Sequence, residues 1–199
     1  MRPAQAFDVI VDSLKLWWQD WGNQVVVSLV AILLSLTVVL FPAALFGIYQ
    51  ESLDLTHRER SGLLGFWRGF KQYLGKSLAW GGVNLVVIFI LVTNVWFYYN
   101  SLLEIAPFLA VLTIIMASLW LIWQLFSLPC LFLQEDKTLK LAWKNGFAII
   151  VQQPLYALII ALVMLALLTL SFFYYIPLVL GSIPLVAILG LRAVQATIE

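Results

Sequence analysis

One stretch decides the fold of this chain, residues 40–80, which reads LFPAALFGIYQESLDLTHRERSGLLGFWRGFKQYLGKSLAW. An apolar segment that contains Pro42 leads through a charged turn into a basic, aromatic-rich segment, and a second apolar segment follows. The same order recurs downstream, where Pro129 interrupts another apolar segment. We therefore predict a parallel internal repeat, with halves at about 25–100 and 107–175.

The composition indicates that the chain faces lipid. Of its 199 residues, 63% are hydrophobic and 11% are charged, and the mean hydropathy is +1.01. A soluble domain contains about 45–50% apolar and about 25% charged residues, so the excess apolar surface must face something other than water. A formal net charge of +1 argues against nucleic acid as a partner, because phosphate backbones need a basic field. The single cysteine, Cys130, excludes an internal disulfide and a thiolate metal cluster.

The apolar segments predict an all-α fold, a polytopic membrane helix bundle that forms a single transmembrane domain. Residues 25–49 carry no charge and are long enough to cross about 30 Å of hydrocarbon at about 1.5 Å per residue. The five expected transmembrane helices are 25–49, 78–99, 107–133, 154–175 and a shorter one at 177–194. The expected interfacial amphipathic helices are 4–21, 62–77 and 137–152.

Two features of the first apolar segment bear on the topology. Pro42 removes a backbone hydrogen bond, so we expect a kink or a break near 38–41. The charged turn 51–61 contains six ionisable residues, too many for the bilayer core, and we expect it to lie in water. Either the first helix crosses the membrane fully, or it is re-entrant and turns back at Pro42.

The distribution of Lys and Arg predicts the orientation in the plasma membrane. With five crossings, nine of these residues lie on one side, and only Arg2 and Lys15 lie on the other. The positive-inside rule then places the N-terminus outside and the C-terminus in the cytoplasm. If the first helix is re-entrant, the N-terminus moves inside and the other sides are unchanged.

The expected transmembrane helices have no ionisable residue in their interiors. Such residues mark proton relays and coupled pumps, so their absence argues against ion-coupled transport. It argues against an enzyme as well, because a nucleophile needs a neighbouring base and a metalloprotease needs a His-Glu-x-x-His helix. We expect no catalytic residue, no metal site and no cofactor, and we interpret the single histidine, His57, as a solvated turn residue.

Amides and indoles are the polar groups that remain at membrane depth, and Asn84, Trp120 and Gln124 form the candidate intramembrane polar face. Such side chains commonly hydrogen-bond between packed helices, which is the interpretation we favour. The alternative is that they line a cavity for a polyhydroxylated ligand.

The two amphipathic segments supply a second candidate surface, a cytoplasmic interfacial face. Their apolar residues alternate with basic ones at helical spacing, and a basic polar face suits an anionic leaflet. The residues of this face are Phe66, Trp67, Phe70, Arg68, Lys71, Trp143, Lys144 and Phe147.

Three segments, LFPAALFGIY at 40–49, FWRGFK at 66–71 and residues 139–155, resemble the bacterial YesL-type membrane proteins, a domain family of unknown function. Residues 45–47 depart from the family pattern, which has a Thr-Ile-Gly-Pro-like run after the first proline. The resemblance implies a small bacterial plasma-membrane protein, in some cases associated with carbohydrate uptake. It supplies no catalytic or binding residues.

These observations predict a non-enzymatic accessory or scaffold component, for example of a solute (carbohydrate) uptake system. Its expected partners are the lipid bilayer and another membrane protein or transporter subunit, and the sequence leaves the oligomeric state open. The alternative is a small permease or a solute-binding membrane bundle built on the repeat.

Overall fold

The computed structural model describes residues 3–174 and 176–198, and in this part of the chain it contains ten helices and no strand. The all-α prediction is confirmed. Two residues used above, Arg2 and Tyr175, lie outside the described residues. The helices are α1 (Pro3–Gln19), α2 (Trp21–Ser35), α3 (Phe41–Thr56), α4 (Leu63–Gln72), α5 (Leu74–Tyr99), α6 (Ala106–Leu133), α7 (Leu139–Gln152), α8 (Pro154–Tyr174), α9 (Ile176–Val179) and α10 (Ser182–Ile198).

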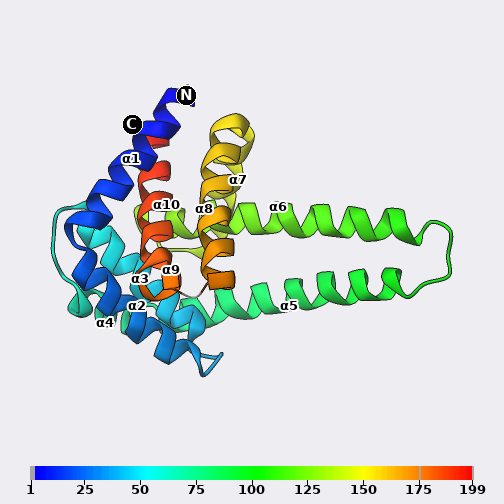
Figure 1. Cartoon of the computed structure of the whole chain (residues 1–199), viewed down its shortest axis with the longest axis horizontal. Coiled ribbons are helices and arrows are strands. Elements are labelled where there is room, and N and C mark those ends of the chain that lie inside the picture. Colours follow the sequence, from blue (N-terminus) through cyan, green and yellow to red (C-terminus); the bar gives the residue numbers. More distant parts are fainter. Residues whose placement is uncertain (1–2, 175, 199) are drawn as a thin grey trace.

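The molecule consists of a body and a projecting hairpin. Helices α5 and α6 pack side by side and extend away from the other helices, which form the body (Figure 1). Within the body, α8 and α10 run crosswise to this hairpin, and the two chain ends lie close together (Figure 1).

Among the described residues, three helices are long and apolar enough to cross a membrane: α5, α6 and α8. The prediction of five is therefore wrong, and the first difference lies at 25–49. This segment is not one helix, because α2 ends at Ser35 and α3 begins at Phe41. The expected break is present, since Val38 between them has a φ of 51°. Pro42 occupies the first turn of α3, where its missing N–H needs no partner, and α3 packs back against α2.

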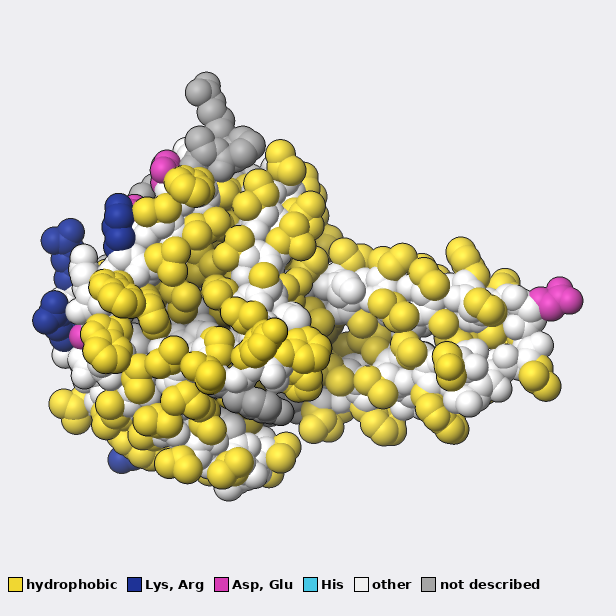
Figure 2. All heavy atoms as spheres, viewed as in Figure 1, with side chains coloured by type: hydrophobic (Ala, Val, Ile, Leu, Met, Phe, Trp, Pro, Cys, Tyr) yellow, Lys and Arg dark blue, Asp and Glu magenta, His cyan; other side chains and the backbone are white. Residues whose placement is uncertain are grey.

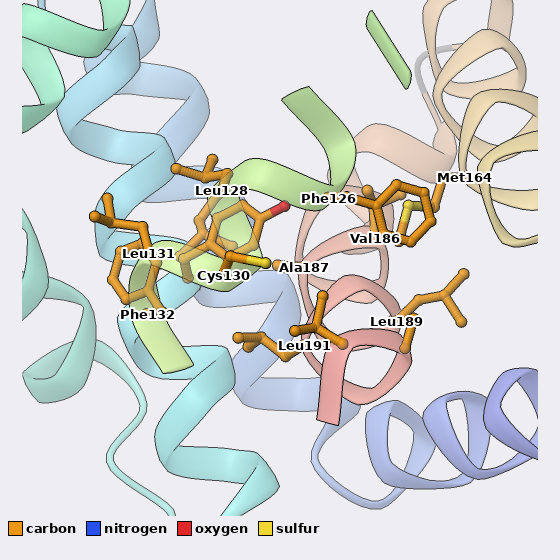
Figure 3. Packing of buried hydrophobic residues seen from close by; sticks show 14 of the residues in the cluster. Phe126, Leu128, Cys130, Leu131, Phe132, Met164, Val186, Ala187, Leu189 and Leu191 are labelled. Carbon is orange, nitrogen blue, oxygen red and sulfur yellow. The ribbon is translucent and has the colours of Figure 1, made fainter. Parts of the chain in front are cut away.

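The second difference lies at 177–194, where the expected fifth crossing is divided at Gly181. This glycine has a φ of 101°, a conformation that side chains with a Cβ rarely adopt, and it separates α9 from α10. Helix α10 packs against α1, α3, α6 and α8 and is a core helix. Figure 3 shows its buried side chains Val186, Ala187, Leu189 and Leu191 packed with α6 side chains and with Met164 of α8.

The amphipathic segments form α4 and α7, and each packs on the helix before it. Segment 62–77 differs from its expected bounds, because α4 ends at Gln72 and the next residues begin α5. Both contacts are made through a glycine. A Cβ on Gly69 would lie 2.3 Å from Cβ of Gln50 in α3, and a Cβ on Gly146 would lie 2.8 Å from the backbone N of Ser127 in α6. The pairs α3–α4 and α6–α7 share this arrangement, and the parallel repeat stays a prediction.

We predict that Gly146→Ala destabilises the protein by about 1–3 kcal/mol, because the added methyl group overlaps the α6 backbone, which cannot move as a side chain can. Gly82→Ala in α5 is the control, since no atom lies within 4 Å of its added Cβ. This control should gain about 0.5–1 kcal/mol from helix propensity. Unfolding in detergent, followed by tryptophan fluorescence, measures both effects, and equal stability of the two variants would contradict the packing role of Gly146.

Candidate functional site

A hydrogen-bonded network of indoles and amides lies where α5 and α6 leave the body, and it brings Asn84, Trp120 and Gln124 together. Trp120 Nε1 donates to Asn84 Oδ1 at 3.0 Å, and Trp80 Nε1 donates to Gln124 Oε1 at 2.9 Å. Asn84 Nδ2 donates to the carbonyl oxygen of Trp80 at 2.9 Å, within α5. Trp143 of α7 adds a longer contact, 3.4 Å from its Nε1 to Gln124 Oε1. Trp80 stands one helical turn before Asn84 and belongs to the network, although it is not among the residues predicted for the polar face.

Most of the polar capacity of this network is used within the protein. Among its side-chain atoms, Gln124 Nε2 is buried without a hydrogen-bond partner. An adjoining cavity of about 200 Å³ lies between α3, α5, α6, α8 and α10, and its lining is apolar except for Tyr49, Trp80 and Gln124. Pockets for small molecules usually enclose about 300–1,000 Å³ with several convergent polar groups. The geometry therefore favours helix–helix hydrogen bonding over a site for a polyhydroxylated ligand.

The eight residues of the expected interfacial face divide into two groups. Phe66 is fully buried, and its ring packs where a Cβ on Gly47 of α3 would lie. Phe70 and Trp143 are partly buried against the core. Arg68 donates from Nη2 to Asp54 Oδ2 at 2.5 Å and joins α4 to α3. The exposed side chains are those of Trp67, Arg68, Lys71, Lys144 and Phe147, and Arg68 is the one among them that Asp54 holds.

Two of the six ionisable residues expected in water, Glu51 and Asp54, are buried in α3, which extends six residues into the expected turn. That expectation is wrong for both residues. Asp54 accepts hydrogen bonds from Gln50 Nε2 at 2.8 Å, from Ser61 Oγ at 2.5 Å and from Arg68. Since every donor belongs to α3, to the following turn or to α4, Asp54 fixes the turn between these two helices.

Glu51 lies between α2 and α3 and is only 1% exposed. Gln24 Nε2 in α2 donates to its Oε1 at 2.7 Å, while Glu51 Oε2 and Gln24 Oε1 are both buried without a partner. Burial raises the pKa of Glu51 from its ordinary 4.5 to about 8; the Gln24 hydrogen bond lowers this pKa, and the charges of Asp20 and Asp54 raise it. A protonated Oε2 is a donor, which is what Gln24 Oε1 lacks. The protonated acid therefore offers an acceptor for Gln24 Nε2 and a donor for Gln24 Oε1.

The described residues contain no group of three or more His, Cys, Asp or Glu side chains that could hold a metal ion. Comparisons of the chain with protein-family models, with curated proteins and with solved structures find no match. The resemblance to the YesL-type family therefore stays a prediction.

We predict that stability falls as the pH rises from 5 to 9 and that Glu51→Gln removes much of this fall. A carboxyl whose pKa is raised by folding contributes stability that is complete below the pKa of the unfolded chain and is lost as the pH passes about 8. Glutamine keeps the shape of the protonated acid and its donor, so the variant should exceed the wild type at pH 9. Thermal unfolding at several pH values measures both chains, and parallel pH profiles would show that Glu51 ionises freely in the folded state.

Proposed function

We propose that this chain is a polytopic integral membrane protein, anchored by the α5–α6 hairpin, that acts as a non-enzymatic accessory or scaffold component of a membrane assembly, for example in solute (carbohydrate) uptake. The observation that carries the proposal is the exposure of the hairpin. Its two helices contain 26 and 28 residues, or about 39–42 Å at about 1.5 Å per residue, and large apolar side chains are exposed along both.

The charges support an orientation with the hairpin across the bilayer. Residues 77–133 contain one residue of the charged types Asp, Glu, Lys and Arg, namely Glu104, which belongs to the link at the hairpin tip. On the face drawn in Figure 2, the Lys and Arg side chains gather at the opposite end of the molecule, and apolar side chains cover the surface between. Charge at both ends of an apolar middle fits a bilayer of about 30 Å hydrocarbon thickness.

We further propose that both chain ends are cytoplasmic. The expectation of an external N-terminus required one crossing by 25–49, and that segment is the α2–α3 pair. All eleven Lys and Arg residues lie outside 77–133, so a spanning hairpin leaves them with the body, and the positive-inside rule places the body inside. The contact between α1 and α10 favours the same side for both ends.

A scaffold is favoured over a permease because the polar groups at depth bond to one another and the cavity beside them is small and apolar. A docking surface for a partner remains on the cytoplasmic helices. Trp67 of α4 and Phe147 of α7 expose their rings beside Lys71 and Lys144 in the same two helices. Exposed aromatic side chains are enriched at protein interfaces.

The membrane orientation is tested by cysteine labelling in intact cells. Cys130 is buried and is replaced by Ala to give a silent background. We predict that Glu104→Cys reacts with an impermeant maleimide from outside, whereas Arg58→Cys and Lys144→Cys react only after permeabilisation. Labelling of Lys144→Cys in intact cells would invert the proposed orientation.

The scaffold role is tested by purification from native membrane in mild detergent. We predict a stoichiometric partner that is lost in the double variant Trp67→Ala/Phe147→Ala, while the chain itself stays at wild-type abundance because both rings are exposed. Phe89→Ala/Phe108→Ala, which removes two exposed rings from the hairpin, is the matched control and should retain the partner. Retention of the partner by the first variant would count against docking through α4 and α7.

A further inference from the structure

A polar cleft of about 520 Å³ opens between α1, the C-terminal end of α3, the turn that follows it and α10. Charged side chains from α1, from the α1–α2 junction, from the turn after α3 and from α10 line this cleft, whereas the cavity beside Trp80 and Gln124 is mainly apolar. Its charged residues are Asp12, Lys15, Asp20, Arg58, Arg60 and Arg192.

The two carboxylates in the cleft are engaged by neighbours within their own segment. Asp12 Oδ1 lies 3.5 Å from Lys15 Nζ. Asp20 is buried, and it accepts a hydrogen bond from Asn23 Nδ2 at 2.9 Å and a longer one from Gln24 Nε2 at 3.5 Å. Lys15 offsets the charge of Asp12, and the oxygens of Asp20 are engaged by amide donors, so neither carboxylate forms an ion pair with an arginine of the cleft.

The three arginines of the cleft have no carboxylate partner in the described part of the chain, where the ion pairs are Lys15–Asp12 and Arg68–Asp54. Arg192 extends from α10, and its Nε is buried without a hydrogen-bond partner. Arg58, which has a φ of 64°, and Arg60 reach the cleft from the turn after α3. Buried donors are normally hydrogen-bonded, and Arg58 and Arg60 line the same cleft as this unpartnered donor.

We propose that this cleft binds a phosphate group of an anionic ligand. Guanidinium groups bind phosphate oxygens through paired N–H donors. Here three arginines from two segments, the turn after α3 and α10, offer such donors to one anion. Trp18 and Trp21, the sequence neighbours of the cleft residues Gln19 and Asp20, are exposed, and exposed indoles favour the headgroup layer. Phospholipid headgroups therefore lie within reach, and soluble phosphates are the other source. The inference does not depend on the scaffold role.

The test uses the full chain in lipid nanodiscs and follows thermal unfolding by tryptophan fluorescence. Discs of phosphatidylcholine alone are compared with discs that contain phosphatidylglycerol, and pyrophosphate is added to the first kind as the soluble probe. A ligand that binds only the folded state raises Tm, and we expect an increase of about 5 °C for at least one probe. An increase with phosphatidylglycerol identifies the lipid source, and an increase with pyrophosphate identifies the soluble one.

Two arginine variants and one lysine control decide whether the cleft causes the increase. Arg58→Gln/Arg60→Gln/Arg192→Gln should lose it, and the double variant Arg58→Gln/Arg60→Gln, which leaves α10 unchanged, should lose most of it. The control matches the double variant in charge and removes two exposed lysines that lie outside both the cleft and the interfacial face; it is Lys76→Gln/Lys140→Gln and should keep the full increase. The proposal is overturned if neither probe raises Tm of the wild type, or if the control loses as much as the arginine variants.

Discussion

The α5–α6 hairpin carries large apolar side chains outward along both of its helices, and this surface must be kept out of water. An α-helix can do this in lipid because all of its interior backbone groups are hydrogen-bonded within the helix. Only the ends then need polar surroundings. At the tip of the hairpin, the link with Glu104 is polar, and at its base the body carries the charged residues. In the proposed orientation, the apolar hairpin therefore determines how the rest of the molecule is placed.

A projecting hairpin needs a rigid base, and two kinds of contact provide it. Aromatic rings from three helices meet there, with Phe46 of α3 packed against Trp80 of α5 and Phe132 of α6 at centroid distances of 6.0 and 5.5 Å. Beside them, the bond from Trp120 to Asn84 joins α6 to α5. A hydrogen bond between membrane helices contributes only about 0.6–2 kcal/mol, so the ring packing holds the base together and the indole–amide pairs fix its register.

The sequence predicts those parts of the fold that depend on length and on local chemistry. The helices α5, α6 and α7 lie within a few residues of their expected bounds, and the break beside Pro42 occurs where expected. Residues 177–194 were assigned to lipid because a short apolar segment has the same pattern in a core as in a bilayer. Two other features depend on tertiary packing, which no local pattern specifies. They are the hydrogen bond between Glu51 and Gln24, 27 residues apart, and the placement of Arg58 and Arg192 in one cleft.

Glu51 shows how α3 carries an ionisable residue directly after an apolar segment. An isolated carboxylate is expensive to bury, and a neutral carboxylic acid with its hydrogen bonds made is far less so. Its partner Gln24 lies on α2, the other helix of the apolar pair, and both side chains are almost fully buried. When Glu51 is protonated, its carboxyl group and the Gln24 amide offer each other one donor and one acceptor. Neither side chain of this pair is then charged. The same pair fixes the register of the two helices, because a shift along either one separates Glu51 Oε1 from the donor Gln24 Nε2.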